Sequence, residues 1–499
     1  MSAPVSGNRI LLVSYHFGRD GATGGFRWSA LVDLLLQEGW EFDVICSTGP
    51  PPAVAGPISD GADPHTAAGG PLEVFPVTGA SVAGAVLGRI EGLPRRLRRA
   101  AQPEPVPRGE AGQAVADVVA TDSGSVDPDA VTVWHPGHRP ALHSRVMREI
   151  SAGAEALETR AWTREAIRVG EALLARRNYR AILVSSPPHG TQMAGVQLSR
   201  MGGGTPLLAD LRDPWVLGLE RFAGILPAIT RRLGRIQERR MIAHADVLIH
   251  NTERHRTAVA AEMRPGPRPD QWVVQNGFDC DPGDPDRDRP DAEVFRMVFA
   301  GWLHPFMDVR AFFRGAGALV RRNRLSPESC RVEFVGTSEE YGGVSLPALA
   351  GAYGLDGFVD MVPRVSRQRA LSIQARASVL VAFDCLHPLC IPMKFFDYAP
   401  MRGRLLLIGN RDGAMADAAA ELDVAVCPVD DEAAVDRVLQ GALEDWRSGA
   451  TPPVNDPARI FHRSVQADVL HRHLRGDLRS KPPLHSGGPG SRKPRPGSR

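Results

Sequence analysis

The chain has 499 residues, which exceeds what one hydrophobic core usually organises, so the length predicts two domains of about 200 residues each with additional segments. Its apolar share of 43% and charged share of 23% are those of an ordinary globular protein, and a formal net charge of +2 argues against a nucleic-acid-binding protein that works by bulk charge. No run approaches the about 20 apolar residues of a membrane-spanning helix, and the N-terminus lacks the pattern of a secretory signal. The six cysteines have neither metal-binding nor disulfide spacing, which favours a cytoplasmic location.

The N-terminal part of the chain alternates short apolar runs with helical periodicity. An apolar run over 8–14 predicts a buried parallel strand, and a glycine-rich turn leads from it into a helix over 26–38 and a strand over 41–46. This succession predicts the start of a doubly wound α/β domain. The remaining elements expected in this half are helices over 163–177 and 226–243 and strands over 181–185, 207–210, 247–250 and 272–275.

Three segments lack the composition of packed structure. Residues 50–129 are rich in Pro, Gly and Ala and are expected to form a partly disordered insertion, while 1–7 and 479–499 are expected to be a disordered start and tail. The Pro/Asp/Arg-rich stretch 279–291 is the strongest domain boundary. We therefore assign 8–290 to an N-terminal domain and 291–478 to a C-terminal domain.

The C-terminal part repeats the α/β rhythm. Two Rossmann-like parallel sheets that face each other across a cleft are the expected architecture, and ligands of such sheets bind beyond the carboxyl ends of the strands. The expected elements are strands over 296–300, 331–335, 379–383, 405–408 and 424–427 and helices over 392–400 and 465–474.

Polar residues follow several strands of the first half. Gly24, Gly25 and Arg27 open the first helix, where backbone amides attract anions, although a plain tight turn explains the glycines equally well. His189 heads the helix after Ser186-Pro187-Pro188, where it either orients a sugar hydroxyl or stabilises charge, or else caps the helix. The cluster of Asp210, Arg212 and Asp213 ends the next strand, and either shapes the loop as an internal ion pair or contacts an acceptor.

The stretch 391–398, Ile-Pro-Met-Lys-Phe-Phe-Asp-Tyr, is the most informative of the second half. Lys394 is the only lysine outside the tail, and a compact ammonium suits a phosphate oxygen in a tight site better than a guanidinium does. Asp397 lies one helical turn later and can accept two hydrogen bonds from a ribose diol. The pair predicts nucleotide-sugar recognition, with an arbitrary surface base or a surface ion pair as the alternatives.

These residues resemble a known family. The chain is similar to the GT-B glycosyltransferases of the family 4-like type, also described as glycosyl transferases group 1, from about Arg9 to Leu474 without the insertion. The resemblance depends on residues 10–27, 185–189, 210–215, 245–246, 251–252, 276–279 and 394–398 together with Gly301 and Gly336.

The resemblance implies a transferase that moves a sugar from a nucleotide diphosphate sugar to an acceptor hydroxyl on a glycan, a lipid or a small molecule. Such enzymes usually retain the anomeric configuration and use no metal and no other cofactor. By position it assigns donor binding to Gly24, Gly25, Gly301, Gly336, Arg364, Lys394 and Asp397, catalysis to His189 and Lys394, and the acceptor side to Arg27, Arg212 and Asp213.

Three departures from the family pattern keep other functions open. Leu389 stands where the family often has a glutamate eight residues before the ribose acid, and Trp302 stands where it often has an arginine. The lysine that usually follows is missing from 304–308, so Lys394 or Arg310 replaces the lost cations or the donor site is weakened. The alternatives are a catalytically silent glycosyltransferase-like partner and a nucleotide-sugar epimerase, although few acid/base candidates support the epimerase.

The sequence leaves the environment of the enzyme open. The expected helix over 226–243 is basic and has Leu226, Ile229, Leu233 and Ile236 on one apolar stripe. Peripheral contact with the inner membrane face through the arginines at 95–99 or 231–240 is compatible with this pattern, but the near-neutral net charge does not favour it. Nothing in the sequence points to nucleic acid, to a metal site or to a particular oligomeric state.

Overall fold

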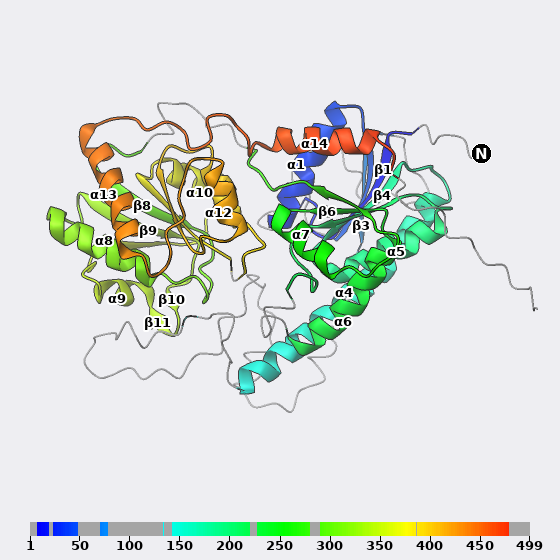
Figure 1. Cartoon of the computed structure of the whole chain (residues 1–499), viewed down its shortest axis with the longest axis horizontal. Coiled ribbons are helices and arrows are strands. Elements are labelled where there is room, and N and C mark those ends of the chain that lie inside the picture. Colours follow the sequence, from blue (N-terminus) through cyan, green and yellow to red (C-terminus); the bar gives the residue numbers. More distant parts are fainter. Residues whose placement is uncertain are drawn as a thin grey trace, which may run out of the picture.

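The computed structural model describes residues 7–18, 23–47, 70–77, 133, 142–219, 227–279, 290–385 and 387–478. The expected disordered tail 479–499, residues 1–6 of the start and all of the insertion 50–129 except 70–77 lie outside these residues. The described residues form two α/β units side by side, each built around one sheet (Figure 1).

The N-terminal unit contains a seven-stranded, wholly parallel sheet in the order β3-β2-β1-β4-β5-β6-β7. Strands β1, β4 and β5 are almost entirely buried because helices cover both faces of the sheet, as expected of parallel strands. The strands are β1 (Arg9–Ser14), β2 (Glu41–Ser47), β3 (Leu72–Val77), β4 (Ala181–Ser186), β5 (Leu207–Leu211), β6 (Val247–His250) and β7 (Asp270–Val273).

Two hydrophobic cores hold helices against this sheet. The face of the sheet to which Leu11 points is covered by four helices, α4, α5, α6 and α7, which contribute Trp162, Leu198, Met241 and Val259 to the core. The opposite face, to which Ile10 points, is covered by α1 and α14. The helices are α1 (Thr23–Gln37), α4 (Leu142–Leu174), the short 3-10 helix η1 (His189–Thr191), α5 (Gln192–Met201), α6 (Ala228–His244), α7 (Glu253–Glu262) and α14 (Arg463–Arg475).

The C-terminal unit contains a five-stranded parallel sheet in the order β12-β9-β8-β13-β14 and a small antiparallel pair, β10 with β11. Helices α8 and α13 pack on one face through Phe312 and Leu439, and α11 and α12 pack on the other through Phe396 and Met415. The elements are β8 (Phe295–Ala300), α8 (Arg310–Asn323), β9 (Cys330–Val335), β10 (Glu340–Tyr341), β11 (Val344–Ser345), α9 (Leu346–Gly351), β12 (Val359–Val362), α10 (Arg367–Ala375), β13 (Val379–Phe383), α11 (Met393–Tyr398), β14 (Arg404–Ile408), α12 (Ala414–Ala420) and α13 (Glu432–Ser448).

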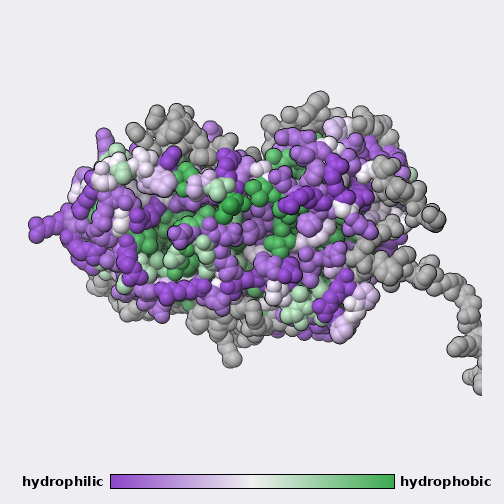
Figure 2. All heavy atoms as spheres, turned by 45° about the horizontal axis from the view of Figure 1, so that its top comes forward, coloured by the Kyte–Doolittle hydropathy of each residue, from purple (hydrophilic) through white to green (hydrophobic). Residues whose placement is uncertain are grey.

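The last helix returns to the first unit. Leu470 and Leu474 of α14 are buried in the same core as Trp28 and Ile10, and Figure 1 shows α14 lying beside α1. The range 291–478 assigned to the C-terminal domain thus ends in a helix that packs on the N-terminal sheet. Figure 2 shows hydrophobic atoms continuing across the middle of one face, where the two units meet.

The expected pattern of two doubly wound parallel sheets is confirmed, and four local expectations change. The helix expected at 163–177 begins already at Leu142, and β3 lies inside the expected insertion. The strand expected over 424–427 is reduced to a single bridge between Cys427 and Ile408. The stripe of α6 faces outward: Ile229, Leu233 and Ile236 are 40%, 43% and 62% exposed, and Leu226 lies outside the described residues.

Candidate functional site

The residues that follow the carboxyl ends of the two sheets meet at the junction between the units. Thr252, after β6, donates a hydrogen bond from Oγ1 to the carbonyl oxygen of Leu389, after β13, at 2.7 Å. Arg367, after β12, places its guanidinium carbon 5.0 Å from the ring centroid of Phe26 in α1. The strand ends that bind ligands in parallel sheets therefore lie together, as the sequence predicts.

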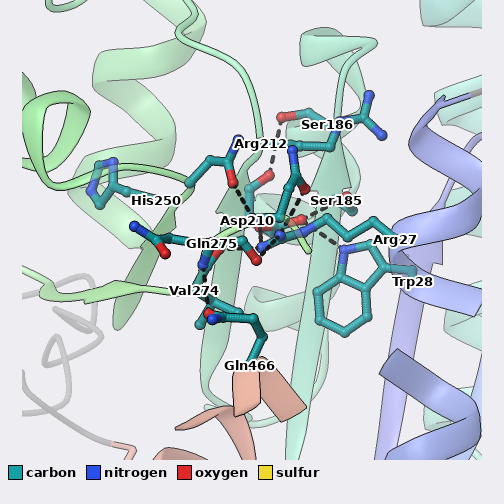
Figure 3. Close-up of polar contacts among 12 residues, drawn as sticks. Arg27, Trp28, Ser185, Ser186, Asp210, Arg212, His250, Val274, Gln275 and Gln466 are labelled. Carbon is teal, nitrogen blue, oxygen red and sulfur yellow. Dashed lines mark hydrogen bonds and ion pairs between the residues drawn. The ribbon is translucent and has the colours of Figure 1, made fainter. Parts of the chain in front are cut away.

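A buried network holds α1 on the N-terminal sheet (Figure 3). Asp210 is fully buried, and its Oδ2 accepts hydrogen bonds from Trp28 Nε1 at 2.7 Å and from Ser185 Oγ at 2.8 Å. Its Oδ1 lies 3.3 Å from Nη2 of Arg27, which is 2% exposed. The same guanidinium donates to the carbonyl oxygens of Val274 and Gln275. Because it is buried and bonded to the chain's own acceptors, this geometry favours a structural role for Arg27 over direct contact with an acceptor.

His189 lies beside this network with its ring parallel to Trp215, at a centroid distance of 5.2 Å. Its Nδ1 is 3.2 Å from Ser186 Oγ. Burial and, to a smaller extent, the nearby Arg212 guanidinium lower the pKa of His189 to about 3. A hydrogen bond with the backbone of Pro214 opposes this shift only in part. At neutral pH the imidazole is therefore uncharged, so it can orient a hydroxyl but cannot supply positive charge.

Arg212 and Asp213 form a loose pair after β5. Arg212 Nε lies 3.8 Å from Asp213 Oδ2, and while the arginine side chain is 8% exposed, the aspartate side chain is 49% exposed. Asp213 is therefore the member of the predicted acceptor set that is open to an incoming molecule.

Lys394, in the first turn of α11, places its side chain beside Gly301, the residue that follows β8. Gly301 has a φ of +114°, and a Cβ added to it would lie 2.7 Å from Lys394 Nζ and 2.8 Å from Cε. The lysine ammonium lies 5.0 Å from the ring centroid of Phe299, a cation–π contact. Burial lowers the pKa of Lys394, and Asp397 only partly opposes this. The ammonium thus lies close to the backbone of Gly301, whose positive φ favours glycine. Removing the ammonium from water at this position disfavours its charged form.

Asp397 is paired within the protein. Its Oδ1 lies 3.2 Å from Nη1 of Arg367, whose Nη2 donates to Asp279 Oδ1 at 3.1 Å. Burial raises the pKa of Asp397, and the Arg367 guanidinium and then the Lys394 ammonium oppose the rise. No sequence motif links Arg367 to Asp397, so the sequence alone does not indicate this partner. The only local signal is the helix-capping Ser366 before it.

The other predicted donor residues are glycines and one exposed arginine. Gly25 lies buried in α1, and Gly24 lies in the same helix. Gly336 ends β9 with a φ of +75°, and a Cβ there would lie 3.9 Å from the Cα of Arg364, which is exposed. Gly301, Gly336 and Lys394 thus lie at the carboxyl ends of β8 and β9, whereas Arg364 follows the neighbouring β12.

The positions that depart from the family pattern have clear environments. Leu389 is 2% exposed and packs near Gly218 of the first unit, so no carboxylate occupies this position. Arg310 is held by Asp308, with Nη2 2.8 Å from Oδ2 and Nε 2.9 Å from Oδ1. Arg310 is therefore already engaged in an ion pair within the chain.

Asp384 is a further titratable residue at this end of the sheet that sequence reasoning missed. It follows β13, and burial raises its pKa to about 6 even though it accepts hydrogen bonds from the amides of Cys385 and Asn410. Among the described residues, no group of three or more His, Cys, Asp or Glu side chains is placed to hold a metal ion.

No family model matches the chain, and no curated protein matches it. Solved structures do resemble it. Sucrose-phosphate synthase from Thermosynechococcus elongatus is 14% identical with a TM-score of 0.54, and the match covers 94% of this chain and 99% of that one. HepE of Anabaena in complex with UDP-glucose is 12% identical with a TM-score of 0.52 and the same coverage. The trehalose 6-phosphate synthase of Burkholderia multivorans is 13% identical with a TM-score of 0.54, over 94% of this chain and 98% of that one. These similarities confirm the expected GT-B fold.

Proposed function

We propose that the protein is a glycosyltransferase that moves a sugar from a nucleotide diphosphate sugar to an acceptor hydroxyl. The fold supports this, because structures of similar fold include one solved in complex with UDP-glucose. The observation that carries the proposal is Lys394 of α11: burial lowers the pKa of its ammonium, which lies close to the backbone of Gly301 at the carboxyl end of β8.

Lys394 is suited to bind the donor diphosphate. A desolvated ammonium is costly in the free protein and gains most from a phosphate oxygen. The Asp397 carboxyl group lies one turn further along α11 and offers acceptor oxygens to a ribose diol, while the Arg367 guanidinium opposes the rise in its pKa that burial causes. The two side chains thus address adjacent parts of one nucleotide.

The proposed reaction follows from these positions. The acceptor oxygen forms a bond to the anomeric carbon while the bond from that carbon to the diphosphate oxygen breaks. The leaving diphosphate keeps the electron pair, takes the acceptor's proton, and has its charge balanced by Lys394. Neutral His189 and exposed Asp213 are the candidate contacts on the acceptor side.

Retention of the anomeric configuration and metal independence belong to this proposal, as does an acceptor that is a glycan, a lipid or a small molecule. We also propose a cytoplasmic location, which the free cysteines at 46, 330, 385, 390 and 427 support.

The test is a thermal-shift and calorimetric screen of the purified chain against UDP, GDP, dTDP and their common sugars. A nucleotide that raises Tm, together with release of nucleoside diphosphate from the matching sugar donor when acceptors are added, supports the proposal. A folded protein that binds none of these nucleotides at millimolar concentration contradicts it.

A second candidate is a catalytically silent glycosyltransferase-like partner. Leu389 favours it, because this position is buried against the N-terminal unit and offers no carboxylate to a sugar. Nucleotide binding without release of diphosphate from any sugar donor would support this candidate over an enzyme.

A further inference from the structure

The outward surface of α6 combines exposed apolar and basic side chains that the proposed sugar transfer does not use. Two contacts fix how this helix is rotated. Glu238 is buried and its Oε2 accepts hydrogen bonds from the amides of Val216 and Leu217 at 2.9 and 2.8 Å. A Cβ on Gly234 would lie 2.7 Å from Val216, so this glycine marks a close approach to the core. The opposite side of α6 must therefore face outward.

That outward side has an apolar stripe. Ile229, Leu233 and Ile236 are 40%, 43% and 62% exposed, and their spacing of four and three residues puts them on one line along the helix. Of the eight large hydrophobic side chains that are exposed among the described residues, three belong to this single helix. Such a concentration is unusual for a surface that only meets water.

The same side is basic. Arg232, Arg239 and Arg240 are exposed beside the apolar stripe, whereas Arg231 and Arg235 are half-buried and belong to the sides of the helix away from it. The only acidic residue of α6 is Glu238, which points to the core. The exposed charge of the helix is therefore entirely positive.

Helix α4 supports α6 from the side. Glu149 of α4 accepts hydrogen bonds from the amides of Ala228 and Ile229 at 2.5 and 2.9 Å, so the start of α6 is fixed to its neighbour. Figure 1 shows the two helices side by side along one edge of the N-terminal unit. Helix α4 adds exposed Ile150 and Leu157, but also exposed acids at 155 and 158, so we confine the basic surface to α6.

We propose that the outward face of α6 docks on the surface of an anionic lipid bilayer. An apolar stripe flanked by arginines on a preformed helix is the pattern of helices that lie in the membrane interface, with apolar side chains among the acyl chains and arginines at the anionic headgroups. The helix does not cross the bilayer: among the described residues, none is both long and apolar enough to do so. A second copy of this chain is a poorer occupant, because a symmetric α6 pair brings like charges together.

The test is co-sedimentation of the full chain with vesicles of phosphatidylcholine alone or with 30% phosphatidylglycerol (about a third of the lipid, enough for a negative surface potential). We expect binding to the anionic vesicles, weakened by salt, and little binding to the neutral ones. Replacing all three exposed arginines, R232Q/R239Q/R240Q, should lower partitioning by about fivefold per charge, on the order of a hundredfold in total. The double variant L233Q/I236Q should lower partitioning to the anionic vesicles by at least tenfold. The reason is that each substituted side chain loses on the order of the transfer free energy of one methylene group when it inserts among the acyl chains.

Val465→Gln is the matched control, because Val465 is an exposed apolar residue, 40% exposed, on a different helix. It should leave vesicle binding unchanged. Equal binding of the wild type to neutral and anionic vesicles, or no binding to either, overturns the proposal. So does a dimer in light scattering that L233Q/I236Q dissociates while vesicle binding is absent. Nucleotide-induced Tm shifts of the variants are measured in parallel, because they separate a failure of membrane docking from a failure of the proposed sugar transfer.

Discussion

The Lys394→Met variant separates a binding role of the lysine from a structural one. Methionine keeps nearly the length of the side chain and its packing beside Gly301 and Phe299, but removes the charge. Burial lowers the pKa of the lysine, so the ammonium is disfavoured in the free protein. Its removal should therefore leave the free energy of unfolding unchanged or raise it.

The effect on nucleotide binding should be large and opposite. A hydrogen bond between a charged donor and a phosphate contributes about 1.5–3 kcal/mol, which is a roughly 10- to 150-fold rise in Kd for the diphosphate. Titration calorimetry with the nucleotide found in the screen measures this, and urea unfolding measures stability. Lys394→Arg is the control: it restores a charge, but the planar group is too large for the space at Gly301, so it should recover only part of the affinity.

The reasoning is refuted if the Kd of Lys394→Met stays within about twofold of the wild type. It is equally refuted if Lys394→Met unfolds at a much lower urea concentration than the wild type. The ammonium would then stabilise the folded protein without a ligand.

Three further predictions concern the framework of the site. Thr252→Val removes both the cap of α7 and the bond to the Leu389 carbonyl oxygen, and should lower the free energy of unfolding in urea by about 1–3 kcal/mol. Arg27→Met strands the buried Asp210 carboxylate and should cost about 3–5 kcal/mol in the same assay. Burial, and then the neighbouring Lys394 ammonium, lower the pKa of His304 to about 4 in the folded protein. Between pH about 6.5 and 4 the unfolded chain therefore binds a proton at this histidine that the folded protein does not bind. Stability should therefore fall as pH drops from 6.5 towards 4, by up to about 1.4 kcal/mol per unit, and His304→Gln should flatten this slope.

Each of these has its own control. Thr252→Ser keeps the hydroxyl and should stay close to wild-type stability, and a loss as large as that of the valine variant would rule out the hydrogen bonds as the cause. A stable Arg27→Met protein with weakened acceptor binding would contradict the structural role and support Arg27 as an acceptor contact. An unchanged acid slope in His304→Gln would show that other buried histidines dominate it.

The sequence predicts the central elements well because their signals are local. The runs Ile10 to Val13 and Val379 to Phe383 are uninterrupted and apolar, and both become buried parallel strands. β3 escapes the same reasoning, because Glu73 and Pro76 interrupt it and only Phe75 and Val77 are buried. An edge strand needs less apolar surface, so its pattern is weak.

The site shows where local patterns stop. That Lys394 and Asp397 lie one turn apart in the same helix follows from their spacing, but the ion-pair partner of Asp397, Arg367, comes from a different helix and only the fold brings the two together. The apolar stripe of α6 is visible in the sequence, yet periodicity cannot tell whether it faces a core or the outside. In this chain Gly234 and Glu238 decide it, because a small residue and a carboxylate that binds two backbone amides take the inner side.

The return of α14 to the first sheet has a consequence for biosynthesis. Gln466 accepts a hydrogen bond from the amide of Gln275, and the ring of His473 stacks on Trp272 at a centroid distance of 4.4 Å. A ribosome delivers these residues only after the whole of the second sheet has been made. In the N-terminal unit, the face of the sheet that α1 and α14 share therefore stays only partly covered until α14 has been synthesised. A nascent chain stalled before residue 463 should accordingly be captured by chaperones through its early half rather than its late one.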